Sequence, residues 1–451
     1  MAGTRNGTTT SRAAAAPPLP DRAAFTDAAV LRRERERVFG ACWQLLGFTA
    51  EFPDAGDYAV RRMGGDEVVV VRDERGAINV LLNSCTHRGT QLCRASFGNA
   101  AHFRCSYHGW TFANDGRLVG VPALRTSYPP GFAKSRHDLP RARVAEYRGF
   151  VFATWCAEAA ELVDHLGEFR WYLDAMLDLP GCGWEVCGPP QRVVAQGNWK
   201  LLTDNFAGDG YHLGTAHRAA FDQGLFSDEL TDGTLGRRGS ELLAANLATA
   251  GGHALRAGYV VPAGTRTLPV PDPPAYPGYP ESEWARFTAA QTDEQMRFNS
   301  HCHVVHGVVF PNTAFLSVSQ DPVLGREGEP VTRYTVWRTH VPLDAHRTEC
   351  TYWTLVPTGL SAEWKRRSRA YQARSQSAGG LLFEVDDMAN FAALDRAVGD
   401  SAAPTDLSLG LQRDRPAADF PGPGSARYGA LSEHNQRAFY RRWHELVEPG
   451  R

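Results

Sequence analysis

The sequence predicts an α+β protein, in which a small antiparallel β domain is followed by a larger domain whose central antiparallel sheet is flanked by helices. Residues 40–155 hold short apolar runs rich in β-branched residues, separated by turn signals. The later chain mixes strand-like runs with long helix-like stretches and shows no βαβ regularity. With 451 residues, the chain is long enough for two domains.

The N-terminal part is expected to form a tail and then a helix. Residues 1–21 are rich in Thr, Ala and Pro and lack the apolar stretch of a secretory signal, so we expect a disordered tail. The periodicity of apolar residues predicts a helix over 26–48, with Asp27 as its cap. We expect the N-terminal helical segment, assigned to residues 22–39, to pack on the larger domain.

The small domain is assigned to residues 40–156. Its apolar runs are short, and each is bounded by charged residues or glycine, which is typical of strands joined by tight turns. Strands are expected at 66–72, 77–82 and 149–155, with turns at 73–76 and 114–116.

The larger domain is assigned to residues 157–451. Its Pro-rich segment, residues 269–280, is incompatible with regular structure. Helices are expected at 158–177, 199–217, 282–298, 361–377 and 432–447, and strands at 304–309, 332–341 and 348–356.

Two Cys/His motifs in the small domain are the strongest functional signal. They are Cys85-Thr-His87 and Cys105-Ser-Tyr-His108, and each offers one thiolate and one imidazole. This donor set suits a two-iron, two-sulfide cluster with two Cys on one iron and two His on the other. Structural zinc is the alternative, but zinc fingers usually group their cysteines in one motif and their histidines in the other.

Bulk composition narrows the function classes further. The chain is 43% hydrophobic and 22% charged with a net charge of -2, so nothing points to nucleic acid or to an anionic membrane. No apolar run approaches the roughly 20 residues that a membrane span needs. Nine cysteines are present, and those outside the two motifs are scattered, which predicts free thiols in the cytoplasm.

A second group of metal-binding residue types lies in the larger domain. Asn205, Asp209 and His212 are spaced i, i+4, i+7, so a helix would place them on one face. His217 is at the wrong angle for that face, but Gly214 between the two histidines lets the helix bend or end. The two imidazoles can then converge on one ion.

Such an ion needs a third ligand. Two His and one carboxylate with open positions form the non-haem Fe(II) site that activates dioxygen. Glu384, Asp386 and Asp387 compete for this role, and an acidic run of this kind is otherwise a solvated helix start.

Other residues carry weaker signals. Trp110 either shields the cluster or packs in the core. Period two places His301 and His303 on one strand face and His306 on the other, so we expect no joint metal site, although one of them could line a pocket. The basic run 365–367 is interpreted as a solvated helix face, with a docking surface for an acidic ferredoxin as the alternative.

Several motifs together resemble the large (alpha) subunit of the Rieske non-haem iron aromatic-ring-hydroxylating oxygenases. They occur in that family's order and cover about residues 26–395. The matching stretches are 83–89, 105–110, Asn198-Trp-Lys200, 205–217, Phe310-Pro-Asn312 and 383–387. A minor departure is Asp204, where many relatives carry Glu before the active-site Asn.

The resemblance implies roles for individual residues. Asp209 matches an aspartate that links a cluster histidine of one subunit to an iron-binding histidine of its neighbour. Asn205 lies near the iron in such enzymes, and Phe206 and Phe383 match pocket walls. The implied ligands are Cys85, His87, Cys105 and His108 for the [2Fe-2S] cluster, and His212, His217 and Asp387 for iron, with Asp386 as the runner-up.

The resemblance also implies a reaction and partners. The chain would be a terminal oxygenase that takes electrons from NAD(P)H through a reductase or ferredoxin and dihydroxylates an aromatic ring to a cis-dihydrodiol. Hydroxylation or demethylation by a monooxygenase on the same iron is the alternative, and a pure electron carrier is a remote one. Family members form trimers of the large subunit, often with a small beta subunit.

Overall fold

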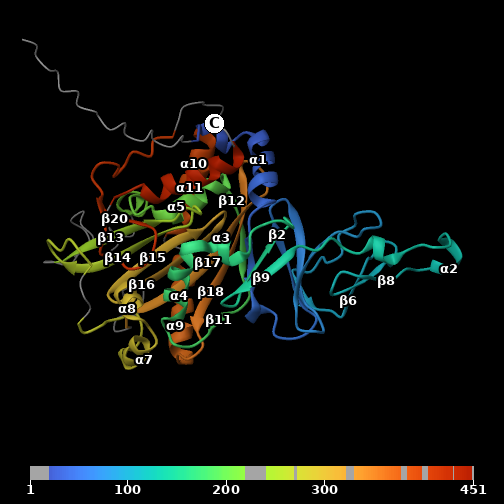
Figure 1. Cartoon of the computed structure of the whole chain (residues 1–451), viewed down its shortest axis with the longest axis horizontal. Helices are drawn as coiled ribbons and strands as arrows, with labels where there is room; N and C mark the ends of the chain where they lie inside the picture. The colour runs from blue at the N-terminus through green and yellow to red at the C-terminus, as the bar shows by residue number, and fades with distance from the viewer. Residues whose placement is uncertain are drawn as a thin grey trace, which may run out of the picture.

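The computed structural model describes residues 20–218, 240–268, 272–320, 330–376, 383–398, 405–429 and 431–448. All but the last two residues of the expected tail, 1–21, lie outside these ranges. A small β-rich part, drawn in blue to cyan, projects from a larger body of sheet and helices (Figure 1). The predicted fold class is therefore confirmed.

The N-terminal segment lies on the larger body. It consists of η1 (Arg22–Phe25), α1 (Ala28–Glu34) and η2 (Arg35–Phe39), and the Asp27 side chain caps α1 by accepting from the Ala29 N–H at 2.7 Å. Glu34 is fully buried and accepts hydrogen bonds from Lys200 Nζ at 2.6 Å and from Trp443 Nε1 at 2.7 Å. A buried ion pair and a hydrogen bond thus join this segment to Lys200 and Trp443, which lie far along the chain.

The expectation of a single helix over 26–48 is wrong in its last part. The helix ends at Gly40, and residues 44–48 form strand β1 (Gln44–Phe48). Every residue of β1 is buried, and the strand pairs antiparallel with β10 (Phe150–Thr154). Burial on both faces of a paired strand outweighs the helix-like spacing of the apolar residues.

The small domain contains antiparallel sheets joined by short turns. One has the order β4–β3–β2–β5, one β6–β7–β8, and one β1–β10–β9. The predicted turns at 73–76 and 114–116 join β3 to β4 and β7 to β8. The strands are β2 (Asp57–Met63), β3 (Asp66–Arg72), β4 (Ile78–Leu82), β5 (Phe97–Asn99), β6 (His102–Arg104), β7 (Thr111–Ala113), β8 (Leu118–Gly120) and β9 (Arg143–Tyr147).

The larger body is built on a ten-stranded antiparallel sheet. Its order is β11–β18–β17–β16–β15–β14–β13–β20–β19, and β12 also pairs with β18. The predicted strands at 304–309, 332–341 and 348–356 are β15, β17 and β18. The bounds are β11 (Trp184–Val186), β12 (Gln191–Gln196), β13 (Ser240–Ala248), β14 (Ala254–Pro262), β15 (Cys302–Val309), β16 (Thr313–Gln320), β17 (Thr332–Pro342), β18 (Arg347–Pro357), β19 (Arg415–Pro416) and β20 (Ser425–Tyr428).

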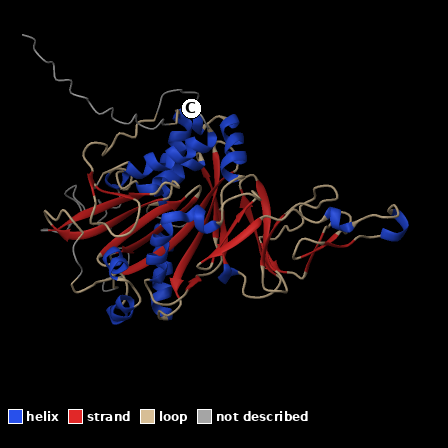
Figure 2. Cartoon of the chain, in the orientation of Figure 1, coloured by secondary structure: helices blue, strands red, loops and turns tan. Residues whose placement is uncertain are grey.

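Helices cover this sheet (Figure 2). Helices α5 and α11 pack on its β13–β16 part, α9 packs on β17 and β18, and α10 packs on β12. The helices are α2 (Leu124–Ser127) in the small domain and α3 (Leu162–Leu166), α4 (Arg170–Asp178), α5 (Trp199–Gly208), α7 (Trp284–Ala289), α8 (Asp293–Asn299), α9 (Ala362–Ser375), α10 (Glu384–Val398) and α11 (His434–Val447) in the larger body.

Three expected helices are shorter or broken. The helix over 158–177 begins only at Leu162 and is interrupted, because Gly167 adopts a φ of 51°. The helix over 282–298 divides at Thr292, which caps α8. The helix over 199–217 ends at Gly208, since Asp209 adopts extended dihedrals with ψ at 95°.

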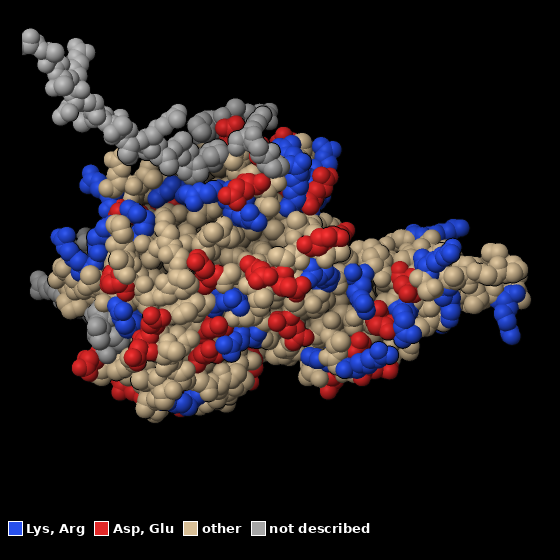
Figure 3. Space-filling model, viewed as in Figure 1, with Lys and Arg blue, Asp and Glu red and all other residues tan. Residues whose placement is uncertain are grey.

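The surface carries both signs of charge. In the face shown in Figure 3, basic and acidic side chains are interspersed over both parts of the chain. The basic run 365–367 is largely paired, because Lys365 contacts Glu185 at 3.1 Å and Arg367 contacts Glu363 at 3.4 Å. Over the residues that the structure describes, no helix is both long enough and apolar enough to cross a membrane.

Candidate metal centres

The two Cys/His motifs form two loops of the same design. The N–H of each cysteine donates to the carbonyl five residues later, from Cys85 to Thr90 at 2.8 Å and from Cys105 to Trp110 at 2.8 Å. The glycine four residues after each cysteine returns a hydrogen bond to the cysteine carbonyl. Gly89 and Gly109 have φ values of 78° and 74°, which a residue with a Cβ adopts only with strain.

The loops bring their donor residues close to each other in pairs, cysteine to cysteine and histidine to histidine. Cys85 and Cys105 are buried, and the ring centroids of His87 and His108 are 4.6 Å apart. Burial works to raise the pKa of the Cys105 thiol, but hydrogen bonds from the backbone at His108 and Tyr107 overcome this and lower it, which favours the thiolate that binds iron. The group offers two sulfur and two nitrogen donors, as a mixed-ligand cluster requires.

A buried nitrogen in this group supports the fit to a cluster. His87 Nδ1 is buried and has no hydrogen-bond partner in the described structure, which is costly unless a metal binds there. Burial, followed by the neighbouring His108, lowers the pKa of His87 and keeps the ring neutral, as a ligand must be.

Trp110 both shields the group and belongs to the core. Its ring stacks on His87 with centroids 4.9 Å apart and planes 12° apart, while its Nε1 donates to the Tyr128 hydroxyl at 3.1 Å. The two interpretations of Trp110 are therefore compatible.

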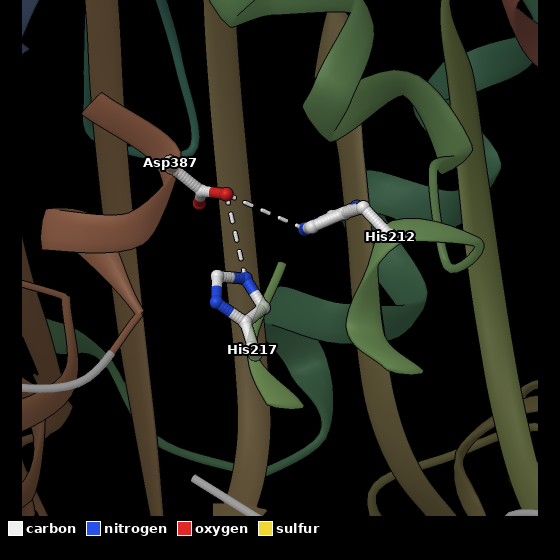
Figure 4. A group of neighbouring side chains, drawn as sticks. All are labelled: His212, His217 and Asp387. Carbon is white, nitrogen blue, oxygen red and sulfur yellow. Dashed lines mark ion pairs between the residues drawn. The ribbon is translucent and has the colours of Figure 1, made fainter. Parts of the chain in front are cut away.

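A second convergence lies where α5 ends. After Gly208 the chain turns through Asp209 into the short η6 (His212–Gly214), and His217 follows. His212 Nε2 lies 3.5 Å and His217 Nε2 lies 3.4 Å from the same oxygen, Oδ1 of Asp387 (Figure 4). The three ligand atoms lie within 4.8 Å of one another, so one ion can contact all of them.

The acidic residues at the start of α10 have three different surroundings. Glu384 is buried and pairs with Arg338. Asp386 lies 3.4 Å from His217 Nδ1, the outer nitrogen of that ring. Asp387 alone faces the inner nitrogens of both histidines, so two His and one carboxylate converge as a non-haem iron site requires.

Asp209 lies behind His212. Its Oδ2 is 3.1 Å from His212 Nδ1, and its Oδ1 accepts from the backbone N–H of Tyr211 at 2.8 Å. Burial works to lower the pKa of His212, but Asp209 overcomes it and the pKa is raised. The Asp209 side chain stays 30% exposed, so one side of the carboxylate can be reached from outside the chain.

Asn205 lies near the end of α5. It lies one turn before Asp209, where its carbonyl accepts the Asp209 N–H at 3.1 Å. The interpretation of Asn205, Asp209 and His212 as one helix face is wrong, because the helix has ended before Asp209.

Two further residues near the site were missed or undervalued in the sequence. Arg256 in β14 is buried, and a Cβ on Gly210 would lie 2.5 Å from its Cζ, so the guanidinium sits directly under the turn that carries Asp209. His306 in β15 is buried and donates from Nδ1 to the Phe206 carbonyl at 3.1 Å. The sequence signals for Arg256 were the glycines on either side of Asp209 and the apolar run that forms β14. The sequence analysis did not predict that strand, so Arg256 was missed.

His301 and His303 lie at the start of this region. His301 has a φ of 57° just before β15, and His303 contacts the Ser319 hydroxyl at 3.2 Å. Among the described residues, His301, His303 and His306 do not form a metal-binding group.

Comparison with known families assigns most of the chain. Residues 42–145 match the model of the Rieske [2Fe-2S] domain, and residues 170–449 match that of the ring hydroxylating alpha subunit catalytic domain. The biphenyl 2,3-dioxygenase subunit alpha of Rhodococcus jostii (strain RHA1) is 33% identical over 435 residues, which cover 94% of this chain and 87% of that relative.

The chain is also similar to a demethylase subunit and to a dioxygenase of known structure. The N,N-dimethyl phenylurea N-demethylase subunit alpha of Sphingobium sp. (strain YBL2) is 31% identical over 93% of this chain and 89% of its own length. The crystal structure of naphthalene 1,2-dioxygenase from Rhodococcus sp. bound to indole superposes with a TM-score of 0.85 at 33% identity, covering 95% of this chain and 94% of that chain.

Proposed function

The chain belongs to the Rieske ring-hydroxylating oxygenase alpha subunits, and on that premise we propose that it is the terminal oxygenase of a multicomponent system that dihydroxylates an aromatic ring. It is an oxidoreductase with a Rieske [2Fe-2S] cluster and a mononuclear iron. The cis-dihydrodiol product and the aromatic hydrocarbon substrate are the proposed part. The observation that carries the proposal is the convergence of two imidazoles and one carboxylate within 4.8 Å in a chain that also has the cluster loops.

We assign the ligands as follows. The cluster is held by the thiolates and imidazoles of the two loops, and the iron by the convergent triad. When bound, the iron supplies open positions for activating dioxygen and the cluster supplies single electrons. The proposed ligands are Cys85, His87, Cys105 and His108 for the cluster, and His212, His217 and Asp387 for iron.

The chain's own residues orient these ligands. Asp209 and Asp386 contact the outer nitrogens of His212 and His217, at 3.1 Å and 3.4 Å. A carboxylate at the outer nitrogen holds the proton there, so the inner nitrogen keeps its lone pair for the metal. Asp209 retains an exposed side, which supports its role as a bridge to a cluster histidine of a neighbouring subunit.

Such a bridge requires an assembly. We propose a homotrimer in which the small domain of one subunit meets the Asp209 region of the next, with a small beta subunit as a further component.

A ferredoxin or reductase would deliver electrons from NAD(P)H. We place the enzyme in the cytoplasm, and none of its nine cysteines forms a disulfide, which fits a reducing compartment. We also propose 40–156 and 157–451 as the two domains, after the segment 22–39.

N-demethylation is a second candidate reaction. It is favoured by the 31% identity to an N-demethylase subunit over 93% of the chain. Both reactions use the same metal centres, so the outcome depends on which substrate atom lies over the iron.

Product analysis separates the two reactions. The purified protein, supplied with a compatible reductase and ¹⁸O-labelled dioxygen, is offered neutral mono- and polycyclic arenes and N-methylated aryl ureas. A cis-dihydrodiol carrying both labelled atoms supports dihydroxylation, whereas formaldehyde from the ureas without any diol supports demethylation. An iron-to-sulfide ratio of one in the reconstituted protein would instead leave only the electron-carrier function.

A further inference from the structure

Arg338 is a buried arginine that contacts three separate elements around the iron site. It lies in β17 and is 1% exposed. Its Nη1 is 3.2 Å from each carboxylate oxygen of Glu384, at the start of α10, and its Nη2 donates to Gln376 Oε1 at 2.7 Å, at the end of α9. Its Cζ lies 4.1 Å from the ring centroid of Phe206 in α5.

A third residue, Tyr352, also contacts the Glu384 carboxylate. The hydroxyl of Tyr352, the direct cross-strand partner of Arg338, donates to Glu384 Oε1 at 2.6 Å. The Tyr352 ring also lies under the guanidinium, with Cζ 4.6 Å from its centroid. The carboxylate of Glu384 is thus held by groups that all belong to the sheet.

This contact bears directly on the metal-binding residues. Asp387 follows Glu384 by three residues in the same helix, and therefore lies on the neighbouring part of the first turn. Phe206 precedes the end of α5 by two residues, and the turn after that end leads to His212. Arg338 consequently touches both segments that supply the iron site, although it contacts none of the three ligands.

We propose that Arg338 is a positioning residue for the mononuclear iron, because its pairing with Glu384 sets the place of α10 and so directs Asp387 toward His212 and His217. This inference rests on the proposed assignment of those three residues as iron ligands. An isolated buried ion pair is often replaceable by apolar residues without loss of stability, so stability alone does not explain this arrangement. The two terminal nitrogens of Arg338 reach different helices, Nη1 to Glu384 and Nη2 to Gln376, while the guanidinium packs on two aromatic rings. A planar group held at these positions fixes direction, which a point charge does not.

The test measures metal binding and not turnover. Protein with its cluster intact and its mononuclear iron removed by a chelator is titrated anaerobically with Fe(II) in competition with a chromophoric chelator. R338M is expected to weaken Fe(II) binding by about 10- to 100-fold, the range seen when the residues that orient metal ligands are lost. The visible spectrum of the cluster is expected to stay unchanged.

Arg333 provides a matched control in the same strand. It is also buried, but its Nε donates to the Pro277 carbonyl at 3.1 Å and its Nη1 to the Ser317 hydroxyl at 3.1 Å, away from α10. R333M and R338M should both lower the unfolding temperature of the iron-free protein. Only R338M should shrink the rise in unfolding temperature that Fe(II) produces.

Three more variants make the outcome decisive. In R338M/E384Q, no unpaired carboxylate is left buried, so the iron-free protein should recover stability while Fe(II) binding stays weak. Recovery of both would overturn the positioning role, and so would an unchanged Fe(II) affinity in R338M. If R338M does not fold, R338K keeps the charge but cannot reach Glu384 and Gln376 with two separate nitrogens, and wild-type Fe(II) affinity in R338K would equally overturn the proposal. D387A tests the ligand assignment independently, because normal Fe(II) affinity in that variant would refute the assignment of Asp387 as an iron ligand.

Discussion

Asp209 Oδ2 lies 3.1 Å from His212 Nδ1, while the opposite nitrogen of the same ring faces Asp387 at 3.5 Å. The imidazole therefore stands between two carboxylates that act on different nitrogens. One carboxylate orients the ring, and the other shares the proposed metal with it.

Replacing Asp209 with Asn should leave both metal centres in place but disturb their connection. The amide is nearly isosteric and still accepts from the Tyr211 N–H, but it lacks the charge that raises the pKa of His212. We expect single-turnover electron transfer from cluster to iron to slow by about 10- to 100-fold. Stopped-flow oxidation of the prereduced cluster measures this rate, and an unchanged rate would refute the bridging role.

The two centres should be separable by single substitutions. C105A should remove the visible spectrum of the cluster while Fe(II) binding at the triad persists. H212A should do the converse, abolishing oxygenation with the spectrum intact. Metal analysis and absorption spectra of the two purified variants check both halves, and loss of both centres in either variant would count against separate sites.

Gly89 should be sensitive to a single methyl group for conformational reasons. Its φ is 78°, and the nearest atom to an added Cβ is the Ser84 hydroxyl at 3.8 Å, so G89A introduces strain without a clash. We expect a cost of about 1–2 kcal/mol, expressed as faster loss of the cluster.

Gly76 supplies the control for that strain. It has a φ of 84° with open space around it, in the β3–β4 turn. G76A should cost a similar amount of folding stability without changing the lifetime of the cluster in a chelator. Equal cluster lifetimes for G89A and wild type would show that the loop tolerates other dihedrals.

Buried neutral histidines should make the fold sensitive to acid. His253 Nδ1 accepts from the Phe310 N–H at 2.9 Å, and burial lowers the pKa of this histidine to about 3. Below the ordinary value of 6.5, the unfolded chain binds a proton that the folded chain does not, so stability falls as the pH falls from 6.5 toward 3. The loss from His253 alone should reach about 3 kcal/mol at pH 4.5, at about 1.4 kcal/mol per pKa unit.

Urea unfolding of the protein at pH 7 and pH 4.5 measures this loss. H253N retains an acceptor near the same place but does not titrate. The variant is therefore expected to start less stable at pH 7 and to lose less on acidification. An equal loss in both proteins would contradict the assignment to His253.

Parts of the fold were predictable because local signals agreed with tertiary pairing. The β3–β4 hairpin has β-branched residues on both sides of a charged turn, and both strands lie where expected. β13 has the sequence Ser-Glu-Leu-Leu-Ala-Ala-Asn-Leu-Ala, which consists largely of helix formers. It is a strand because β14 and β20 pair with it on either side, and such pairing is invisible in a local window.

The metal site was likewise predictable only in part. His212 and His217 could be found from their spacing, whereas spacing alone did not separate Asp387 from Asp386 and Glu384. Their surroundings separate them, since Asp387 faces the inner nitrogens of both histidines, Asp386 faces the outer nitrogen of His217 and Glu384 faces Arg338. Arg256 and Arg338 were not singled out, because their partners are long-range and a lone arginine in a strand has no motif.

The buried contact of Glu34 with Lys200 and Trp443 bears on how this chain is made. The segment 22–39 is translated before both partners, yet the Glu34 carboxylate is neutralised by Lys200 and accepts a hydrogen bond from Trp443 in α11, both of which are translated much later. The small domain can complete its own sheets in the meantime, as an insertion between the first segment and the body it joins. A fragment that starts at residue 157 should therefore expose the Lys200 ammonium in an apolar hole, and co-expression of the first 40 or so residues would be needed to fill it.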